Sequence, residues 1–429
     1  MGDKAHAGLS FGLDKLKSKF PDLLYNRSLI DHAMKALDSS SQFGAMVIRI
    51  DEPPHKDKPS ETNQVSNILL DVAGTIDLIC RNDNGIWGQT GSSMFGCFFP
   101  ETDEHLCRDI VKKIQHKLGE DGNKTVTIGI ALYPTINFDK DRILDNAYKA
   151  LCHADFFGPG SAVFFDTISL NISGDHLYQE NDINGAIEEF KTALMLDPLN
   201  VNVHNSLGVC YGALGAFEKA LEHFEQAIQI DSGEIMALHN AGVVNILINN
   251  KDNALELLLK AESLGEDIFE VAFQTGKLYL EKKEFGKARQ LLEKAVKLRP
   301  ESVAAFRYLG ECYESVQMTD EAVSAYKKAI RLNPNDAYSL SALSLLFDLQ
   351  GENPEITEIF CQQSIDIAPE NGLFRNRLGR IYLKQNKLKE ALTEFEKAHD
   401  LGYDSMEFIK KTQDMVIVQP LRHKGTKKR

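Results

Sequence analysis

Five alanines recur at a constant interval of 34 residues in the second half of the chain. They are Ala186, Ala220, Ala254, Ala288 and Ala322. Each is followed by a bulky apolar residue four positions later and a small residue seven positions later, and these offsets place side chains on one face of a helix. A fixed period of this length is typical of stacked helical hairpins, in which each unit buries its apolar face against its neighbours. The interval therefore predicts a solenoid with no single closed core.

A second periodic set precedes the alanines and indicates an earlier helix in each unit. It is a Leu-Gly pair followed by a tyrosine, as in Leu207, Gly208 and Tyr211, and it recurs from Leu309 and from Leu378. Prolines, which cannot continue a helix, close several units. These are Pro198, Pro300, Pro334 and Pro369. Every repeat is therefore predicted to contain two helices.

This order of residues resembles the tetratricopeptide repeat. The resemblance implies about seven units over residues 167–403, which together form an all-α superhelical solenoid. Pro334 and Pro369 are 35 residues apart, which predicts a one-residue insertion in the inter-helix turn of the sixth unit, with Ile356 in the usual alanine place. The seventh unit recovers the pattern at Ala391. Residues 404–416 are expected to form a capping helix, and residues 417–429 a short, basic, disordered tail.

Before the repeats, the pattern changes to alternating strands and helices. Strands are predicted at residues 45–51, 94–99, 125–132 and 162–165, and the second of these forms a hairpin with residues 85–88. Helices are predicted at residues 65–80, 101–118 and 144–154. Residues 20–166 are therefore expected to form one α/β domain with a central sheet, after an N-terminal extension of residues 1–19.

Three segments of this domain resemble the GGDEF domain of bacterial diguanylate cyclases. They are residues 24–27, 126–131 and 147–158. The signature hairpin of that family aligns with Gly91, Ser92, Ser93, Met94 and Phe95, so that the second glycine and both acids are replaced. The family's metal-binding aspartate falls at Arg49, and Gln89 replaces the arginine before the hairpin.

A triphosphate substrate requires Mg²⁺ held by carboxylates, and a guanidinium cannot ligate a metal. The resemblance therefore implies a degenerate domain, in which only Asp51 survives from the acids of the first strand. We expect no catalytic, cofactor-binding or metal-binding residues in this chain.

Four residues of the first domain have a functional interpretation and a simpler structural one. Arg49 is expected to reach solvent or to pair with Asp51 and not to hold a phosphate. Trp87 is expected to pack in the core and not to stack on a base. Cys152 and His153 adjoin on one helix but lack a spaced second ligand, so no metal site is predicted there.

Composition limits the classes of partner. The formal net charge of -14 disfavours contact with a nucleic-acid backbone. The sequence has no run of eighteen apolar residues and no signal-peptide core, so a cytoplasmic protein with no membrane partner is predicted. The seven cysteines include no C-x-x-C pair, which favours neither a disulfide framework nor a zinc site.

The repeats carry the positive evidence for function. In the tetratricopeptide family, the first helices line a concave groove that holds a peptide or a partner helix. The candidate groove residues by this resemblance are Asn205, His239, Asn240, Phe273, Gln274, Lys277, Arg307, Tyr308, Glu311, Asn376, Arg377 and Arg380. The three arginines suit an acidic segment or a C-terminal carboxylate. The competing interpretation is a hydrophobic partner helix on Phe273 and Tyr308, with Tyr338.

These patterns together predict a non-catalytic scaffold or adaptor that binds a protein or peptide partner, with an inactive GGDEF-like domain in a regulatory or structural role. The alternative is a nucleotide sensor or residual diguanylate cyclase, in which the first domain binds GTP or a cyclic dinucleotide and the repeats control it. The alternative requires metal-binding acids near Gly91, where Ser93 and Met94 stand.

Overall fold

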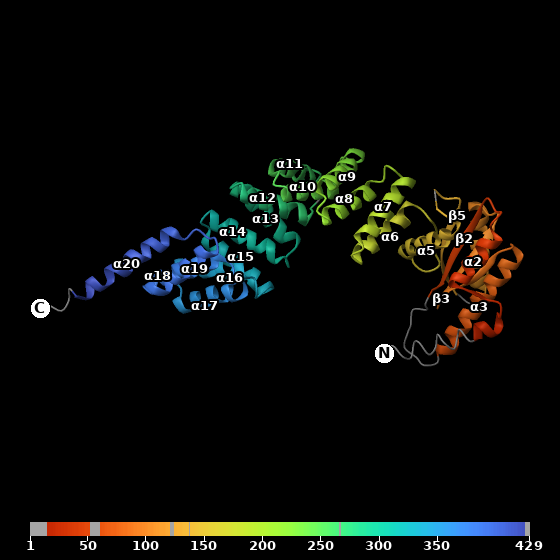
Figure 1. Ribbon diagram of the computed structural model, residues 1–429, viewed down its shortest axis with the longest axis horizontal. Helices are drawn as coiled ribbons and strands as arrows, with labels where there is room; N and C mark the ends of the chain where they lie inside the picture. The colour runs from red at the N-terminus through yellow and green to blue at the C-terminus, as the bar shows by residue number, and fades with distance from the viewer. Residues whose placement is uncertain (1–14, 52–60, 121–123, 137, 266, 425–429) are drawn as a thin grey trace. The chain divides into compact units, whose positions relative to one another are not determined.

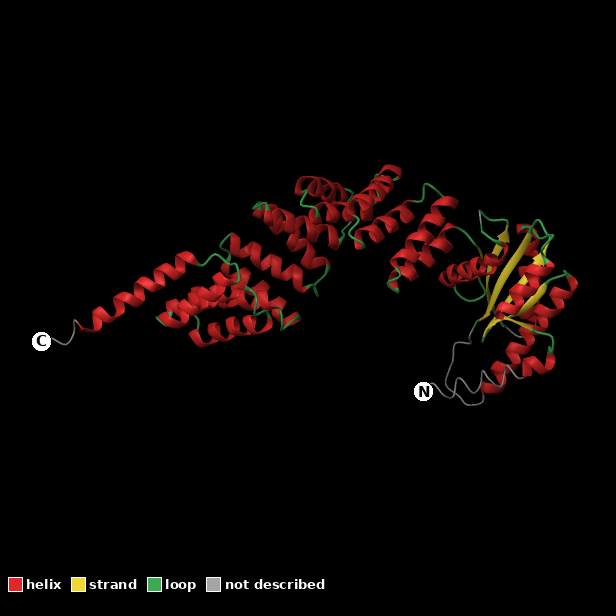
Figure 2. Cartoon of the chain, viewed as in Figure 1, coloured by secondary structure: helices red, strands yellow, loops and turns green. Residues whose placement is uncertain are grey.

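The computed structural model describes residues 15–51, 61–120, 124–136, 138–265 and 267–424. Two compact units divide the chain after Ser232. The first unit contains an α/β domain and helical pairs, and the second contains helical pairs only (Figures 1 and 2). Among the described helices, none is both long enough and apolar enough to cross a membrane.

The α/β domain is built on one mixed sheet. Its strands are β1 (Leu24–Tyr25), β2 (Phe43–Ile50), β3 (Ile86–Gly91), β4 (Met94–Pro100), β5 (Val126–Tyr133) and β6 (Ala162–Phe164). Their order is β1-β3-β4-β2-β5-β6, with β2 antiparallel to both β4 and β5 at the centre. The four predicted strands and the hairpin are confirmed, with small shifts of their ends.

Helices cover both faces of this sheet. They are α2 (Asn26–Ala36), α3 (Glu61–Asn82), α4 (Glu104–Glu120) and α5 (Ile143–Ala154), with short 3₁₀ turns η1 (Lys140–Arg142) and η2 (Asp155–Phe157). Successive side chains of β2 point to opposite faces, so Met46 and Ile48 pack with α3 and α4 while Ala45 and Val47 pack with α2 and α5. Because β2 is buried on both faces, its sequence is a nearly continuous apolar run.

Three helices of this domain differ from the predictions. The first, α3, begins at Glu61 and not at residue 65. The helix predicted from residue 101 begins at Glu104, because Glu101 has a φ of 49° and the carboxylate of Asp103 accepts a hydrogen bond from the Leu106 N–H at 2.9 Å. This bond caps the first turn of the helix. No helix was predicted at α2, of which only Asn26 and Arg27 fall in a segment that resembles the GGDEF family.

The repeat region consists of helical pairs, and we call the first helix of each pair helix A and the second helix B. The pairs are α6 (Thr167–Gln179) with α7 (Ile183–Leu196), α8 (Val201–Ala213) with α9 (Phe217–Ile230), α10 (Ile235–Leu247) with α11 (Lys251–Ser263), α12 (Phe269–Glu281) with α13 (Phe285–Leu298), α14 (Val303–Ser315) with α15 (Thr319–Leu332), α16 (Ala337–Gln350) with α17 (Pro354–Ile367), and α18 (Gly372–Lys384) with α19 (Leu388–Asp400). The five periodic alanines are all fully buried, as the period predicts.

Within most pairs, a glycine of helix A lies against a bulky side chain of helix B. A Cβ atom added to Gly208 would lie 2.4 Å from the Phe224 ring, and one added to Gly310 would lie 2.7 Å from the Tyr326 ring. The sixth pair has a different solution, in which Ser344 faces the smaller Cys361 through a side-chain hydrogen bond. Cys361 on helix B is smaller than the rings and leucines of the other pairs. Helix A can therefore carry the Ser344 side chain where the other pairs have glycine.

The turn inside each pair explains the irregular sixth unit. Residues with positive φ follow helix A at Asn181, Gly215, Asn249, Lys283, Gln317, Gly351 and Asn386. α17 begins three residues after Gly351, whereas α15 begins two residues after Gln317, so the predicted insertion in the inter-helix turn is confirmed. The extra residue moves every repeat position of α17 by one residue toward the C-terminus. Thr357 therefore takes the buried alanine place, and the prediction of Ile356 is wrong, because that side chain is 43% exposed.

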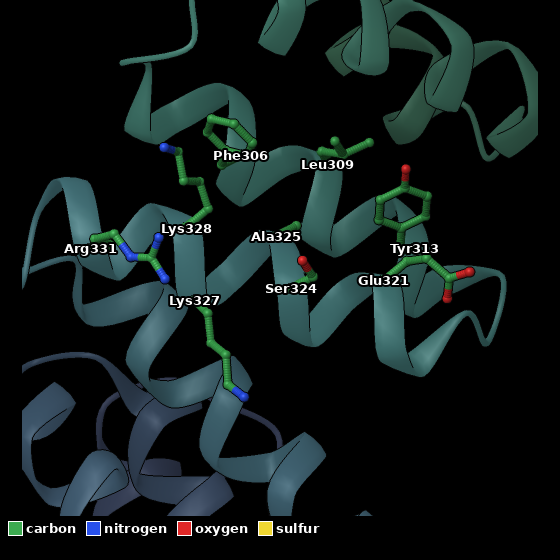
Figure 3. Close-up of a pocket in the computed structure, with 9 residues that line it drawn as sticks. All are labelled: Phe306, Leu309, Tyr313, Glu321, Ser324, Ala325, Lys327, Lys328 and Arg331. Carbon is green, nitrogen blue, oxygen red and sulfur yellow. The ribbon is translucent and has the colours of Figure 1, made fainter.

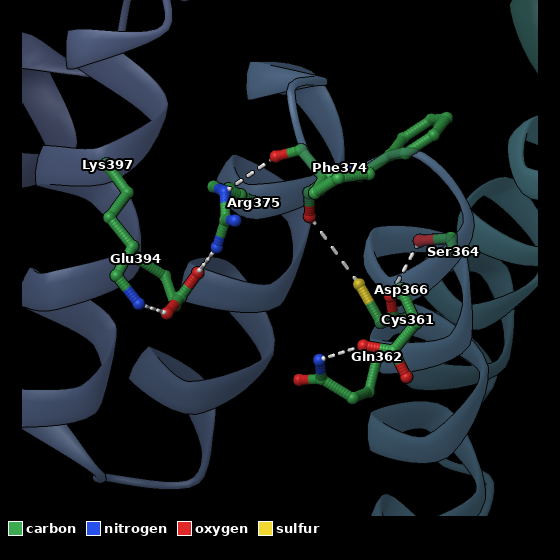
Figure 4. A network of polar contacts seen from close by, with 9 residues as sticks. Cys361, Gln362, Ser364, Asp366, Phe374, Arg375, Glu394 and Lys397 are labelled. Carbon is green, nitrogen blue, oxygen red and sulfur yellow. Dashed lines mark hydrogen bonds and ion pairs between the residues drawn. The ribbon is translucent and has the colours of Figure 1, made fainter.

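Polar side chains connect α18 to α19 and to the turn that precedes α18 (Figure 4). Arg375 donates through Nη1 to Glu394 at 3.1 Å and through Nε to the Pro369 carbonyl at 3.1 Å. Lys397 donates to the other oxygen of Glu394 at 2.7 Å. Glu394, whose side chain is 12% exposed, thus pairs with a largely buried arginine and with a half-exposed lysine.

The C-terminal end of the array is covered by α20 (Met406–Lys424). Phe408 stacks on Phe395 with ring centroids 5.1 Å apart, and Ile409 is buried in the same cluster. The helix ends at Lys424 and not at residue 416, so the expected tail is helical at its beginning; residues 425–429 lie outside the described part of the chain. Ile417 continues the apolar pattern of the helix past the predicted end.

At the other end of the array, α5 of the α/β domain packs against α6. Lys149 donates to both carboxylate oxygens of Glu189, at 2.7 and 2.8 Å, and both side chains are largely buried. His153 lies 3.3 Å from the carboxylate of Asp166, which caps α6. The α/β domain therefore belongs to the same compact unit as the first two helical pairs.

Candidate functional site

A cavity of about 330 Å³ lies where the resemblance placed the metal-binding acids. Strand register sets Arg49 directly opposite Met94 on one side and Thr127 on the other. Ser93 lines the cavity next to this position, together with Asp51 and Asp155. The residues aligned with the family's metal site thus meet in space, but they bring an arginine and a thioether where carboxylates would be required.

The charges in this cavity have partners within the protein. Arg49 forms a two-pronged ion pair with Asp155, with one Nη1–Oδ2 distance of 3.0 Å. This hydrogen bond is the main cause that raises the pKa of the Arg49 guanidinium. The carboxylate of Asp51 accepts hydrogen bonds from the Thr127 hydroxyl at 2.6 Å and from the Gly160 N–H at 2.8 Å. The predicted pairing of Arg49 with Asp51 is wrong, because the side chain reaches η2 instead.

The signature segment itself has no free polar cluster. Gly91 sits at an irregularity in the β3–β4 register, Ser92 is exposed at the turn, and Phe95 is fully buried. Met94 lines a second cavity of about 280 Å³ beside Tyr148. Among the residues that the structure describes, no group of three His, Cys, Asp or Glu side chains is placed to hold a metal ion.

Trp87 and His153 have structural environments. The Trp87 Nε1–H donates to Asp77 at 3.2 Å, and its ring meets Phe20 edge-on at 5.3 Å, which confirms the packing interpretation. His153 is buried beside Asp166 at the start of α6, and among the described residues neither belongs to a group of three side chains that could hold a metal ion.

In the second unit, aromatic rings and cations alternate across four A helices. We call this set the A-helix ladder. It consists of Phe273 and Lys277 on α12, Arg307 and Tyr308 on α14, Tyr338 on α16 and Arg377 on α18. Phe273 and Arg307 hold equivalent repeat positions, as do Tyr308 and Arg377, and such positions lie on the same face of successive helices. Lys277 and Tyr338 hold other positions and join the set through their contacts.

The ring contacts of the A-helix ladder are continuous. The Lys277 Nζ lies 5.6 Å from the Phe273 ring centroid and 5.0 Å from that of Tyr308, and the two rings meet edge-on at 5.7 Å. The Arg307 guanidinium lies 5.3 Å from Tyr308 and 5.9 Å from Tyr338. Arg377 lies 5.5 Å from Tyr338 on its other flank. These distances are within the range of cation–π attraction.

The three candidate arginines do not form one free basic surface. Arg307 donates to the carboxylate of Asp336 at 3.1 Å. Arg377 is 7% exposed and donates to the Ser341 hydroxyl at 3.2 Å. Arg380 is exposed but lies over the Phe408 ring of α20, at 5.8 Å. The joint carboxylate site expected from the sequence is therefore divided among three different environments.

Glu311 lies in the middle of this surface and is half-buried. Burial is the main cause that raises the pKa of its carboxyl, and the neighbouring charge of Glu314 acts in the same direction. Arg377 and Arg307 oppose this effect. A carboxyl with a raised pKa between two cations makes the surface mixed in charge and not uniformly basic.

The other candidate residues lie away from the A-helix ladder or inside the protein. Asn376 is 3% exposed and donates to the Ser405 hydroxyl at 2.8 Å, so it connects α18 to the start of α20 and cannot face a ligand. His239 is buried on α10, with Nδ1 3.1 Å from the Asn240 amide oxygen, and burial lowers its pKa. Gln274 is half-buried on α12, and Asn205 lies on α8 of the first unit.

Four family models match the chain, and all describe the tetratricopeptide repeat. They match residues 174–215, 201–233, 273–337 and 374–401. The chain therefore contains tetratricopeptide repeats, as the 34-residue period predicted. A search of curated proteins found no match.

Several solved structures are similar to the repeat region. The crystal structure of YrrB, described as a repeat protein with an unusual peptide-binding site, is 20% identical, with a TM-score of 0.39, over 43% of this chain and 95% of that one. A tetratricopeptide repeat protein from Parabacteroides merdae is 20% identical, with a TM-score of 0.43, over 58% and 98%. The PilF protein of Pseudomonas aeruginosa is 18% identical, with a TM-score of 0.45, over 49% and 95%.

Proposed function

Given its tetratricopeptide repeats, we propose that the chain is a non-catalytic scaffold that binds a segment of a partner protein on the A-helix ladder. The observation that carries the proposal is the continuous series of rings and cations over α12, α14 and α16. Half-buried aromatic rings supply large contact area at a small cost in conformational entropy.

The geometry favours an aromatic or aliphatic ligand over a purely acidic one. Arg307 and Arg377 already have partners inside the protein, so a ligand carboxylate would compete with Asp336 and Ser341. Lys277 makes only ring contacts among the described residues. We infer a partner helix or extended segment that places apolar side chains on Phe273 and Tyr308, with a single carboxylate near Lys277.

We also propose that the α/β domain has a degenerate GGDEF-like fold without cyclase activity and serves a structural or regulatory role. Arg49 lies opposite Met94, and both Asp51 and Asp155 are held by protein groups. The packing of α5 on α6 supports the structural role. Location in the cytoplasm and binding of no nucleotide are part of this proposal.

The test uses the full chain as bait, with partners identified by mass spectrometry. We expect Phe273→Ala with Tyr308→Ala to lose at least one partner that the wild type retains, by tenfold or more. Tyr403→Ala, which removes a 37% exposed ring outside the A-helix ladder, is the matched control and should retain it. Equal recovery by all three proteins, with unchanged helical spectra, would contradict the proposal.

A further inference from the structure

α14 carries a second surface opposite the A-helix ladder. Arg307, Tyr308 and Glu311 lie on one side of the helix, while Phe306 and Leu309, with Tyr313, lie on the other. At 3.6 residues per turn these two sets point in nearly opposite directions. A ligand on the second set would therefore not compete with one on the A-helix ladder.

This second surface forms the floor of a cavity of about 470 Å³ between α14 and α15 (Figure 3). Leu309 and Ala325 are buried, and Phe306 is half-buried, so the floor is apolar. The volume lies in the range of about 300 to 1,000 Å³ that is typical of ligand pockets. The cavity is thus large enough for one or two side chains of a partner.

The two ends of the cavity differ in charge. Lys328 and Arg331 lie with Phe306 at one end, and Glu321 lies with Tyr313 at the other (Figure 3). Lys327 points away from this end, with its Nζ 5.1 Å from the Phe347 ring centroid on α16. A bound segment would therefore have a preferred direction, with its negative charge beside Phe306.

The cations at the first end lack a counter-charge among the residues that the structure describes. Within the described ranges, neither Lys328 nor Arg331 forms an ion pair, although the chain has 62 acidic and 48 basic residues. One repeat earlier, Lys294 takes the helical position of Lys328 and pairs with Asp267 at 3.0 Å. The Lys328 Nζ instead lies 5.8 Å from the Phe306 ring centroid, over the floor of the cavity.

The helix dipole explains only part of this arrangement. Arg331 lies in the last turn of α15, where the dipole stabilises a cation. The dipole does not account for the position of Lys328 over Phe306 or for an open apolar floor between them. A ligand that supplies a carboxylate and an apolar side chain would satisfy both features.

We propose that this cavity is a second binding site, which takes a short acidic segment of a partner protein. An aromatic or aliphatic side chain of the segment lies on Phe306 and Leu309, and an adjacent carboxylate lies between Lys328 and Arg331. Glu321 repels a second negative group at the far end, which disfavours a nucleic-acid backbone. The site goes beyond the proposed function, because it uses the opposite face of α14.

The test uses a fluorescein-labelled peptide with a Leu-Phe-Leu core, three glutamates on one side and three serines on the other, prepared in both orders, titrated with the full chain and followed by anisotropy. We expect saturable binding that is at least tenfold tighter than that of two comparison peptides, one with lysines for the glutamates and one with a triple-serine core. Binding should weaken with added salt, because the contact is between exposed charges.

Variants locate the site. Lys328→Glu with Arg331→Glu, and separately Phe306→Ala, should each reduce affinity at least tenfold. The matched control, Lys260→Glu with Lys297→Glu, changes exposed lysines at the same helical positions of earlier repeats and should bind as the wild type does. Tyr308→Ala should also leave this peptide unaffected, which separates the result from the test of the A-helix ladder.

Three outcomes would overturn the proposal. The first is no binding of the glutamate peptide at millimolar protein, and the second is an equal loss in the test and control variants while the melting temperatures stay unchanged. The third is displacement of the peptide by a nine-nucleotide oligothymidine that binds more tightly than the peptide, which would assign the site to single-stranded nucleic acid.

Discussion

The cavity beside Arg49 and the cavity beside Arg331 each contain an arginine, but the surroundings of the two side chains differ. In the α/β domain, Arg49 is held by Asp155, and Asp51 is held by Thr127 and Gly160. Between α14 and α15, Arg331 and Lys328 have no carboxylate partner among the described residues. Charges already satisfied by the fold stabilise it, whereas unsatisfied charges are available to a partner.

The largest effect is expected where charges are satisfied away from solvent. Glu394→Ala removes the acceptor shared by Arg375 and Lys397, and hydrogen bonds to charged groups contribute about 1.5 to 3 kcal/mol. The free energy of unfolding should fall by that amount in urea titrations. Glu321→Ala, at the open end of the α14–α15 cavity, should change it by less than about 0.5 kcal/mol. Similar losses of unfolding free energy in both variants would contradict the distinction between charges that the fold satisfies and charges that it leaves unpaired.

A smaller effect is expected at Arg49. The pair with Asp155 is partly exposed, with side chains 33% and 44% accessible, so its coupling should be about 0.2 to 1 kcal/mol. A double-mutant cycle with Arg49→Met and Asp155→Asn measures this coupling directly. Arg331→Met should show no coupling to Glu321→Gln in the same measurement. A zero coupling at Arg49 would mean that this cavity, too, has charge available for a ligand.

We expect no enzymatic turnover of a nucleotide. We predict no cyclic dinucleotide product from GTP with Mg²⁺ or Mn²⁺ in excess, since carboxylates are required to hold the metal and Arg49 lies opposite Met94. Product analysis by chromatography, against a heat-denatured control, checks this. Turnover that is abolished by Asp51→Ala would reverse the assignment, because the one surviving acid would then suffice.

The sequence predicted those features that repeat locally. The 34-residue period located the buried alanines, the two helices of each unit and the inserted residue of the sixth turn, because each depends on neighbours within one hairpin. The error at Ile356 arose because the insertion was placed in the turn before the helix, but the positions of the helix that follows were not shifted by one residue. Threonine does not belong to the alanine pattern, so Thr357 can be recognised at this position only from its burial.

Contacts between distant segments could not be predicted in the same way. Arg49 and Asp155 are 106 residues apart, and no periodicity relates them. Arg307 and Asp336 belong to successive repeats, so the arginine that suggested a carboxylate site already had a carboxylate. The α14–α15 cavity left one signal in the sequence, the adjacent cations Lys327 and Lys328 followed by Arg331, without acids beside them.

The ion pair between Lys149 and Glu189 holds the α/β domain against the first helical pair, so the junction resists rotation. Rotation of the domain about residues 165–167 would have to break this ion pair and pull α5 from α6, with both charges largely removed from water. A mechanical load or a ligand acting on the sheet would therefore be transmitted first to the helices of residues 167–230. For the same reason, removal of residues 1–166 would leave Glu189 without its cation and α6 without its cover.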